Sequence, residues 1–366
     1  TLAGGGPVSG SRGAPLLLLG GSGLLGGAFR RALAGRDAQI APKTDIAPKT
    51  DIASKTEIGA KTEIGARTHI GEQTRGAAQT RNARRVQIAN RADIAIERLV
   101  DGTSILHRTR FACVINCIAH TRVEAAEDAV AESFRINALL PGLVAAACRE
   151  TGARMVHVSS TGAYGTGQDE PWDDYATPRP ATVHHRSKIA GEEAVRAELP
   201  GALILRTGWL YGPPPHGRTD FVAMIAEQAT EAASRGAALL SDGGQAGNPT
   251  LTDDVAGQAL ALLDAGIGGT YNCVAGGVVR RLDYVSAIVA ALGLAIRVEQ
   301  APPGHFKRRA PVSPNEGAVN LKLQQMGLDR MPDWHGALCA HIAVRGLEPD
   351  LGRDLERGPG TGATDA

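Results

Sequence analysis

A glycine-rich stretch near the N-terminus has the spacing of a phosphate-binding loop. The segment "GGSGLLGG" places Gly20, Gly23 and Gly26 at every third position, after the apolar run "APLLLLG" and before an amphipathic segment. Glycines let the backbone turn tightly and approach a pyrophosphate, whose charge is stabilised by the N–H groups and dipole of a helix N-terminus. Because the loop lies between a strand pattern and a helix pattern, it predicts a dinucleotide site.

The residue type that follows the second strand would distinguish NADH from NADPH. An acidic side chain there hydrogen-bonds the adenosine ribose, whereas a cation accepts a 2′-phosphate. Both Lys43 and Asp45 fall in this window. Lys43 favours NADPH, and NADH stays open.

Short apolar runs alternate with helical patterns along most of the chain. The runs "FACVINCIA", "RMVHVSS" and "ALILRTGWLYG" are rich in Leu, Val and Ile without in/out alternation, which is typical of parallel strands covered on both faces. The pattern predicts an α/β protein with a Rossmann-type doubly wound parallel sheet and a smaller C-terminal α/β lobe that binds substrate.

Composition changes suggest four segments. We expect a flexible leader at 1–13, an NAD(P)-binding Rossmann domain at 14–212, a mainly substrate-binding lobe at 213–346 with segments that return to the first domain, and a flexible tail at 347–366. The first domain carries an insert at about 41–80 with a six-residue repeat, "IASKTE IGAKTE". A solvated surface loop is the favoured interpretation; a short parallel β-helix and a partner-binding or oligomerising insert are the alternatives.

The bulk composition favours a small-molecule protein of the cytoplasm. A formal net charge of +1 over 366 residues, without a basic stripe, argues against nucleic acid or a membrane surface as partner. The five cysteines include no CxxC pair, so buried thiols in a reducing compartment are expected and no metal site is. The run "PLLLLGG" is too short for the core of a signal peptide.

Several further motifs occur in one order: "VINCIAHTRVEAAED" from Val114, "FRINALLPGLVAAA", "RMVHVSSTGAYG", "HHRSKIAGEE" from His184, "LRTGWLYG" and "DGGQAGNPTLTDDVA". Together with the glycine loop they make the chain similar to the extended short-chain dehydrogenase/reductases. More narrowly, it resembles the dTDP-4-dehydrorhamnose reductases and related nucleotide-sugar 4-ketoreductases. The resemblance runs from about Pro15 to Leu338, interrupted by the repeat.

The resemblance implies roles for individual residues. Ser160 would hydrogen-bond the substrate carbonyl, Lys188 would hold the nicotinamide ribose and lower the pKa of the catalytic acid, and Asn137 would tie backbone together. The implied cofactor contacts are Gly20, Ser22, Gly23, Leu24, Leu25, Gly26, Lys43, Asn116, Ala119 and Lys188. The implied substrate contacts are Thr121, Ser160, Trp209, Phe221, Gln245, Asn248 and Thr250.

The chain departs from the family at the proton donor. The family's YxxxK motif has tyrosine four residues before the lysine, and here that residue is His184. An imidazole has a reference pKa of about 6.5, which the charge of Lys188 would lower, so His184 would be a poor acid at neutral pH. A hydroxyl from Tyr164 or Tyr175 is an alternative donor.

Two functions follow from this departure. The first is NAD(P)H-dependent reduction of a nucleotide-activated 4-keto-6-deoxysugar, with Ser160, His184 and Lys188 as catalytic residues. The second is a catalytically impaired regulatory or scaffold protein that keeps the dinucleotide fold. The expected partner is a nucleotide sugar, with a homodimer as an option.

Overall fold

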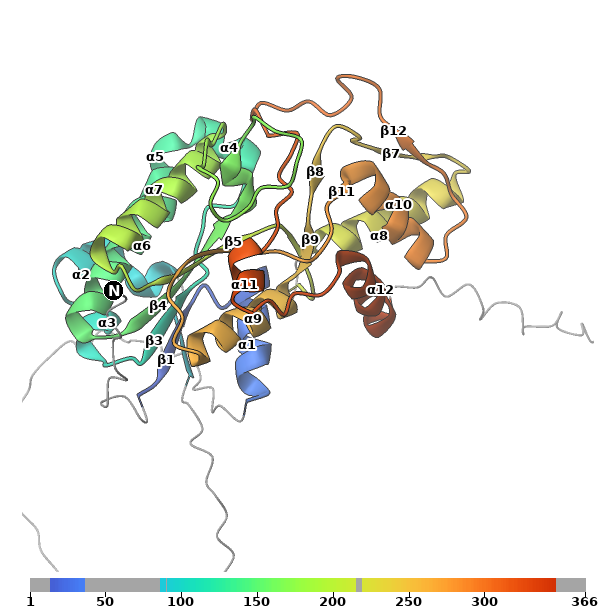
Figure 1. Cartoon of the computed structure of the whole chain (residues 1–366). Coiled ribbons are helices and arrows are strands. Elements are labelled where there is room, and N and C mark those ends of the chain that lie inside the picture. Colours follow the sequence, from blue (N-terminus) through green and yellow to red (C-terminus); the bar gives the residue numbers. More distant parts are fainter. Residues whose placement is uncertain (1–13, 37–85, 90, 215–218, 347–366) are drawn as a thin grey trace, which may run out of the picture.

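A six-stranded parallel β-sheet forms the centre of the molecule (Figure 1). The computed structural model describes residues 14–36, 86–89, 91–214 and 219–346. The chain builds from β1 to β2 on one side and from β3 onward on the other, so the topological switch point lies between β1 and β3. This confirms the expected fold class. In spatial order the strands are β10 (Gly269–Cys273), β5 (Leu203–Thr207), β4 (Arg154–Ser160), β3 (Cys113–Asn116), β1 (Leu16–Leu19) and β2 (Val86–Ala89).

Some expectations fall outside the described residues. These are the leader at 1–13, the repeat insert at about 41–80 with Lys43, and the tail at 347–366.

Helices cover both faces of the sheet, as its apolar strands require. All four residues of β1 are buried, because Leu17 and Leu19 face one core cluster while Leu16 and Leu18 face the other. The first cluster is closed by α2 (Ile96–Val100), α3 (Ile105–Arg108), α6 (Leu140–Thr151) and α7 (Val183–Glu198). The second is closed by α1 (Leu24–Ala34), α9 (Thr252–Asp264) and α11 (Leu321–Gln325).

A smaller lobe packs beside the sheet (Figure 1). It has its own core, in which Tyr211, Tyr284 and Leu338 are fully buried. Its helices are α8 (Phe221–Ser234), α10 (Arg281–Ala291) and α12 (Trp334–Arg345). Three strand pairs complete it: β6 (Trp209–Tyr211) with β9 (Pro249–Leu251), β7 (Leu239–Ser241) with β12 (Val298–Gln300), and β8 (Ala246–Gly247) with β11 (Val279–Arg280).

One helical run, Val130–Thr151, has the length and composition of a membrane-spanning helix. Half of it is buried inside the molecule, and its C-terminal part contributes Leu140, Val144 and Cys148 to the core on the sheet. We therefore interpret this run as a core helix. The run comprises α5 (Val130–Phe134), a π-helical turn at Arg135–Leu139 and α6.

The π turn is in close backbone contact with α7. A Cβ atom on Gly191 would overlap the carbonyl oxygen of Asn137, so only glycine permits this approach. Single π turns inside α-helices are often found at functional sites. Here the turn limits how closely α7 can approach the helical run at Val130–Thr151.

This contact predicts that Gly191→Ala destabilises the fold, by about 3 kcal/mol, because backbone must move to admit the methyl group. The matched control is Gly257→Ala, in the exposed middle of α9, where a Cβ would meet nothing within 4 Å. That change should stabilise by about 0.5 to 1 kcal/mol. Urea unfolding of both variants measures the difference; equal stabilities would contradict the close contact.

Candidate functional site

The glycine loop joins β1 to α1 with the geometry expected of an anion site. Gly20 has φ +78°, and Gly23 N–H donates to its carbonyl at 3.0 Å. A Cβ on Gly26 would overlap that same carbonyl. Helix α1 begins at Leu24 without a side-chain cap, so N–H groups of its first turn are left for a negatively charged ligand. The loop therefore fits a dinucleotide pyrophosphate.

Asn116, at the carboxyl end of β3, supports the backbone beside this loop. Its Oδ1 accepts the Ile118 N–H at 3.1 Å, and its Nδ2 lies 3.2 Å from Nδ1 of His157. The side chain is 1 % exposed. Asn116 thus holds the turn that leads to Ala119, and cofactor contact by Asn116 or Ala119 stays a prediction.

Ser160 ends β4, and within the described part of the chain its hydroxyl hydrogen has no acceptor. Its Oγ accepts the N–H of Gly162 at 3.3 Å and so caps the short 3-10 turn Thr161–Tyr164. That bond uses a lone pair of the oxygen and leaves the hydrogen. The residue can therefore donate to a carbonyl oxygen at the edge of the sheet.

Helix α7 carries the other two catalytic candidates, and its first turn is firmly capped. Oγ1 of Thr182 accepts the N–H of His185 at 3.1 Å, while Oε1 of Glu127 accepts the N–H of Val183 at 2.8 Å. These bonds satisfy donors that a helix start leaves unpaired. Because the start is fixed, His184 and Lys188 lie one helical turn apart on the same face.

Lys188 is buried beside β4. Its ammonium group donates to the carbonyl of Val158, two residues before Ser160 in the strand. Burial lowers the pKa of Lys188 to about 8, although the Glu192 carboxylate acts in the opposite direction. The structure therefore brings Lys188 close to the end of β4 that carries Ser160.

His184 is fixed by its Nδ1 atom, which lies 2.9 Å from the carbonyl oxygen of His120. Burial is the main cause that lowers the pKa of His184 to about 4, and the charge of Lys188 lowers it further. The backbone hydrogen bond to His120 opposes both effects. At neutral pH the imidazole is thus uncharged, as the sequence suggested.

Neither alternative tyrosine is placed to replace it. The hydroxyl of Tyr164 donates to Oδ1 of Asn272 at 2.7 Å and accepts from Arg206 at 3.1 Å, and the ring is fully buried. Burial also raises its pKa. Tyr175 is 62 % exposed, and its hydroxyl donates to Oε1 of Gln325 at 2.9 Å. His184 remains the candidate proton donor.

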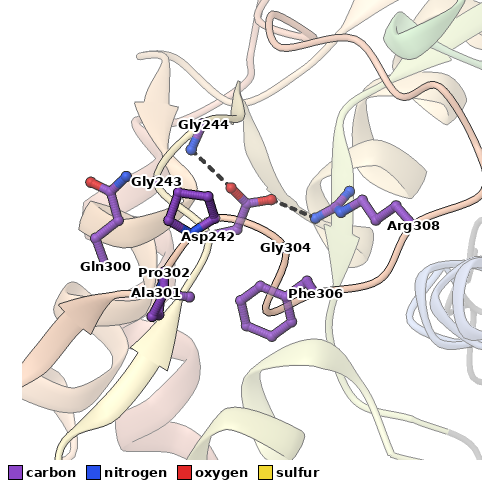
Figure 2. Close-up of a pocket in the computed structure, with 10 residues that line it drawn as sticks. Asp242, Gly243, Gly244, Gln300, Ala301, Pro302, Gly304, Phe306 and Arg308 are labelled. Carbon is purple, nitrogen blue, oxygen red and sulfur yellow. Dashed lines mark hydrogen bonds and ion pairs between the residues drawn. The ribbon is translucent and has the colours of Figure 1, made fainter.

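Two adjoining cavities lie in the lobe, and neither is lined by Ser160, His184 or Lys188. The first, of about 360 Å³, is shown in Figure 2, where Asp242 pairs with Arg308 at 2.7 Å above Phe306. The second, of about 310 Å³, shares these three residues. Its walls also include Phe221, Met224, Ile225, Gln228, Leu240, Ser241, Gln245, Arg281 and Val285.

A row of contacts joins the second cavity to helix α7. The Arg281 guanidinium lies 3.5 Å from the ring centroid of Trp209, whose Nε1 donates to Glu316 at 2.7 Å. A Cβ on Gly162 would lie 2.9 Å from Oε1 of Glu316 and would overlap the ring of His185. The cavity is therefore connected to α7 through a chain of packed side chains.

The predicted substrate residues differ in what they can offer. Phe221 and Gln245 line the second cavity, and Trp209 adjoins it through Arg281. Within the lobe, Asn248 and Thr250 are fully buried. The Asn248 amide donates to the carbonyls of Ala275, Gly277 and Ala318. The Thr250 hydroxyl donates to the Asn248 carbonyl and accepts the Ala275 N–H. These two residues brace the lobe. Thr121 is exposed, and its contact with substrate stays a prediction.

Comparison with known proteins identifies the family. The family model described as RmlD substrate binding domain matches residues 62–345. The chain belongs to this family. The dTDP-4-dehydrorhamnose reductase of Mycobacterium tuberculosis is 35% identical over 250 residues, which cover 66% of this chain and 80% of that protein. A probable dTDP-4,6-dihydroxy-2-methyloxan-3-one 4-ketoreductase of Streptomyces antibioticus is 30% identical over 228 residues, covering 62% and 75%.

Solved structures show the same fold. A dTDP-4-dehydrorhamnose reductase from Clostridium acetobutylicum superposes with a TM-score of 0.72 at 22% identity, covering 91% of this chain and 99% of that one. UDP-glucose 4-epimerase from Thermus thermophilus, solved with NAD, gives a TM-score of 0.63 at 21% identity, covering 90% and 98%. The family resemblance expected from the motifs is thus confirmed.

Other residues of this RmlD-family chain contribute to the site without a local sequence signal. Glu127 caps α7 across 56 residues, and Arg281 and Arg308 bring positive charge to one cavity from distant segments. Glu316 is buried, and burial raises its pKa. A helix start at Val183 that lacks an acidic residue of its own was the one hint that a distant carboxylate is needed there.

A buried ion pair anchors α7 one turn beyond Lys188. Both oxygens of Glu192 accept from Arg206, at 2.9 and 2.7 Å, and the two side chains are 0% and 7% exposed. Burial alone would raise the pKa of Glu192, but the hydrogen bonds and charge of Arg206 outweigh it, so the pKa lies below its ordinary value. The pair therefore stabilises the fold at neutral pH, and this contribution is lost as the pH falls through that lowered pKa.

Arg206→Met should destabilise the protein by about 3 to 5 kcal/mol at neutral pH, because Glu192 keeps its charge without its buried partner. Arg196→Met is the matched control. It also removes an arginine from Glu192, at 3.1 Å, but this side chain is 43% exposed, so the loss should be under about 1 kcal/mol. Denaturant unfolding at neutral pH compares them; similar losses would show that the buried pair has no special weight.

Proposed function

We propose that this protein catalyses the NAD(P)H-dependent reduction of a nucleotide-activated 4-keto-6-deoxysugar, with His184 in place of the usual tyrosine. The proposal rests on the arrangement at the end of β4. There Lys188 is hydrogen-bonded to the Val158 carbonyl, Ser160 has a hydroxyl hydrogen to donate, and His184 lies one turn before Lys188 on α7. The names of the relatives, which include reductases of dTDP-4-dehydrorhamnose, support the same reaction.

The first domain would bind the cofactor. The loop at Gly20, Gly23 and Gly26 would receive the pyrophosphate on the uncapped start of α1. Lys188 has ammonium hydrogens beyond its bond to Val158 and would hold the nicotinamide ribose. When bound, the reduced nicotinamide supplies the hydride. NADPH is the form that Lys43 favours, and this preference and the cytoplasmic location remain predictions.

The lobe would bind the nucleotide. The cavity of about 310 Å³ is lined by the aromatic Phe221, the amide Gln245 and the two arginines Arg281 and Arg308. Arginines suit phosphate oxygens, and an aromatic wall suits a base. The contacts through Trp209 and Glu316 would then direct the sugar toward Ser160. The substrate role of these residues is part of the proposal.

The chain's own residues handle the proton. Ser160 would donate a hydrogen bond to the ketone oxygen, and the imidazolium form of His184 would donate the proton as the alkoxide develops. Since the pKa of His184 is about 4, that form is scarce at neutral pH. Reduction is therefore proposed to be an acid-favoured activity.

The rate of reduction should fall as the pH rises. With a dTDP-4-keto-6-deoxysugar and NADPH, we expect kcat/KM to drop by up to about tenfold per pH unit between about pH 5 and about pH 8, because the protonated fraction of His184 falls. His184→Tyr should gain on the order of 100-fold near neutrality, since Lys188 lowers a tyrosine pKa toward neutral. Loss of NADPH absorbance measures both proteins.

His184→Gln is the control, because it fills the position without a titratable proton. It should be slow at every pH in that range and should lack the slope. A flat profile for the natural protein, equal to that of His184→Gln, would remove His184 from the proton transfer.

The cofactor role of the loop can be separated from folding. Gly26→Ala places a methyl group on the carbonyl of Gly20, so the loop must open and the dissociation constant for NADPH should rise by about tenfold or more. Gly27→Ala is the neighbouring control, because its Cβ would lie 3.5 Å from a flexible Arg31. NADPH fluorescence titration measures both. Equal affinities would argue against pyrophosphate binding at this turn.

A second function is favoured by one observation, the uncharged state of His184. A chain that binds the dinucleotide but cannot supply the proton would be a catalytically impaired regulatory or scaffold protein. The same kinetic series separates the two functions. Turnover by His184→Tyr alone would indicate the silent relative, whereas acid-favoured turnover by the natural protein indicates the reductase.

A further inference from the structure

The peptide of His120 is held by one side chain at both of its polar groups. Oδ1 of Asn137 accepts the His120 N–H at 2.8 Å, and Nδ2 of Asn137 donates to the His120 carbonyl at 3.1 Å. The same Nδ2 also donates to Oγ of Ser187 at 2.9 Å. The side-chain amide of Asn137 and both polar groups of the His120 peptide are thus hydrogen-bonded in a part-buried environment. The orientation of the His120 carbonyl is therefore strongly constrained.

That carbonyl determines which nitrogen of His184 carries hydrogen. A carbonyl oxygen only accepts, so the Nδ1 of His184 that lies 2.9 Å away must be the donor. In the uncharged ring, Nε2 is then the acceptor. Within the described residues Nε2 has no hydrogen-bond partner, and it is the ring atom left for a ligand.

Asn137 is itself fixed by the packing of α7. It lies in the π turn, and Gly191 of α7 rests directly on its carbonyl oxygen. Ser187, its other partner, belongs to the same helix and donates to the His184 carbonyl at 2.7 Å. Asn137, which orients the His120 peptide, is thus held in a fixed position relative to α7, the helix that carries His184.

We propose that Asn137 is a positioning residue that fixes His184, through the His120 carbonyl, in the tautomer whose Nε2 accepts a hydrogen bond. The uncharged site then binds a hydroxyl group, and at neutral pH it holds the C4 alcohol of a nucleotide sugar better than the C4 ketone. This catalytic consequence rests on the proposed function, whereas the tautomer does not.

The groups around His184 favour the uncharged ring. Burial lowers its pKa most, and the charge of Lys188 on the same helix lowers it further. The backbone hydrogen bond to His120, on the loop after β3, acts in the opposite direction, while the His120 imidazole lowers the pKa slightly. The ring of His185 lies 4.9 Å away between centroids. From α4 (Val123–Asp128), Glu127 faces the helix start, but its carboxylate accepts the Val183 N–H. Among the residues that the structure describes, no carboxylate is one of the groups that shift this pKa. At neutral pH the His184 ring is therefore an uncharged imidazole, with hydrogen on only one of its two nitrogens.

Nitrogen-15 NMR of the full chain labelled at histidine tests this directly, without substrate. His184→Gln identifies the His184 signals by their loss. In the natural protein at neutral pH, Nδ1 should be protonated and Nε2 not. In Asn137→Ala the freed His120 peptide should shift the tautomer ratio toward Nε2–H by roughly fivefold, the loss expected for one hydrogen bond.

Ser187→Ala is the matched control, because it removes the other partner of Nδ2 and leaves both bonds to His120. Its tautomer ratio should equal that of the natural protein. If Asn137→Ala does not fold, Asn137→Asp serves, since it keeps the acceptor for His120 N–H and sets a second acceptor against the carbonyl. An Nε2–H tautomer in the natural protein, or an unchanged ratio in a folded Asn137 variant, would overturn the proposal. Absence of reductase activity would leave these signals unaffected and would count against the proposed function alone.

Discussion

The site depends on the placement of α7 against its neighbours. This placement is possible because Gly191 has no side chain. Gly191 allows the helix to rest on the carbonyl of Asn137, and the buried pair of Glu192 with Arg206 follows directly after it. At the N-terminal end of the helix, Glu127 and Thr182 satisfy free N–H groups. Because this end and the middle of α7 are held, the one-turn spacing of His184 and Lys188 becomes a fixed position relative to β4.

The positive charge of Lys188 has opposite consequences for a tyrosine and a histidine at position 184. A nearby cation stabilises the tyrosine anion, so it lowers a high pKa toward neutrality and makes the phenol a better acid there. Burial disfavours an imidazolium, the same cation adds to this effect, and together they take the pKa of His184 down to about 4. One electrostatic arrangement therefore suits a phenol at neutral pH and confines an imidazole acid to low pH. The histidine does not inherit the working range of the residue it replaces.

The sequence predicts well what depends on local spacing. The glycine loop, the buried parallel strands and the relation of His184 to Lys188 all lie within short segments, so period and residue type suffice. It predicts poorly what depends on distant partners. The cap from Glu127 and the use of the His120 carbonyl arise only when separate segments meet. For Asn248 and Thr250, the motif indicated substrate contact, whereas the folded chain uses their polar atoms to hold backbone. A buried polar side chain must find partners, and a motif does not say whether these are protein or ligand.

The two parts of the molecule meet at Gly162 with little room for relative movement. The ring of His185 and the carboxylate of Glu316 occupy the space that a side chain at Gly162 would need. Glu316 in turn receives the indole N–H of Trp209, and Arg281 stacks on the same indole. Close-packed contacts of this kind transmit displacement, because they leave no void to absorb it. The wall of the lobe cavity and Ser160 at the end of β4 therefore keep a fixed separation, and a ligand that reaches both must match that separation in length.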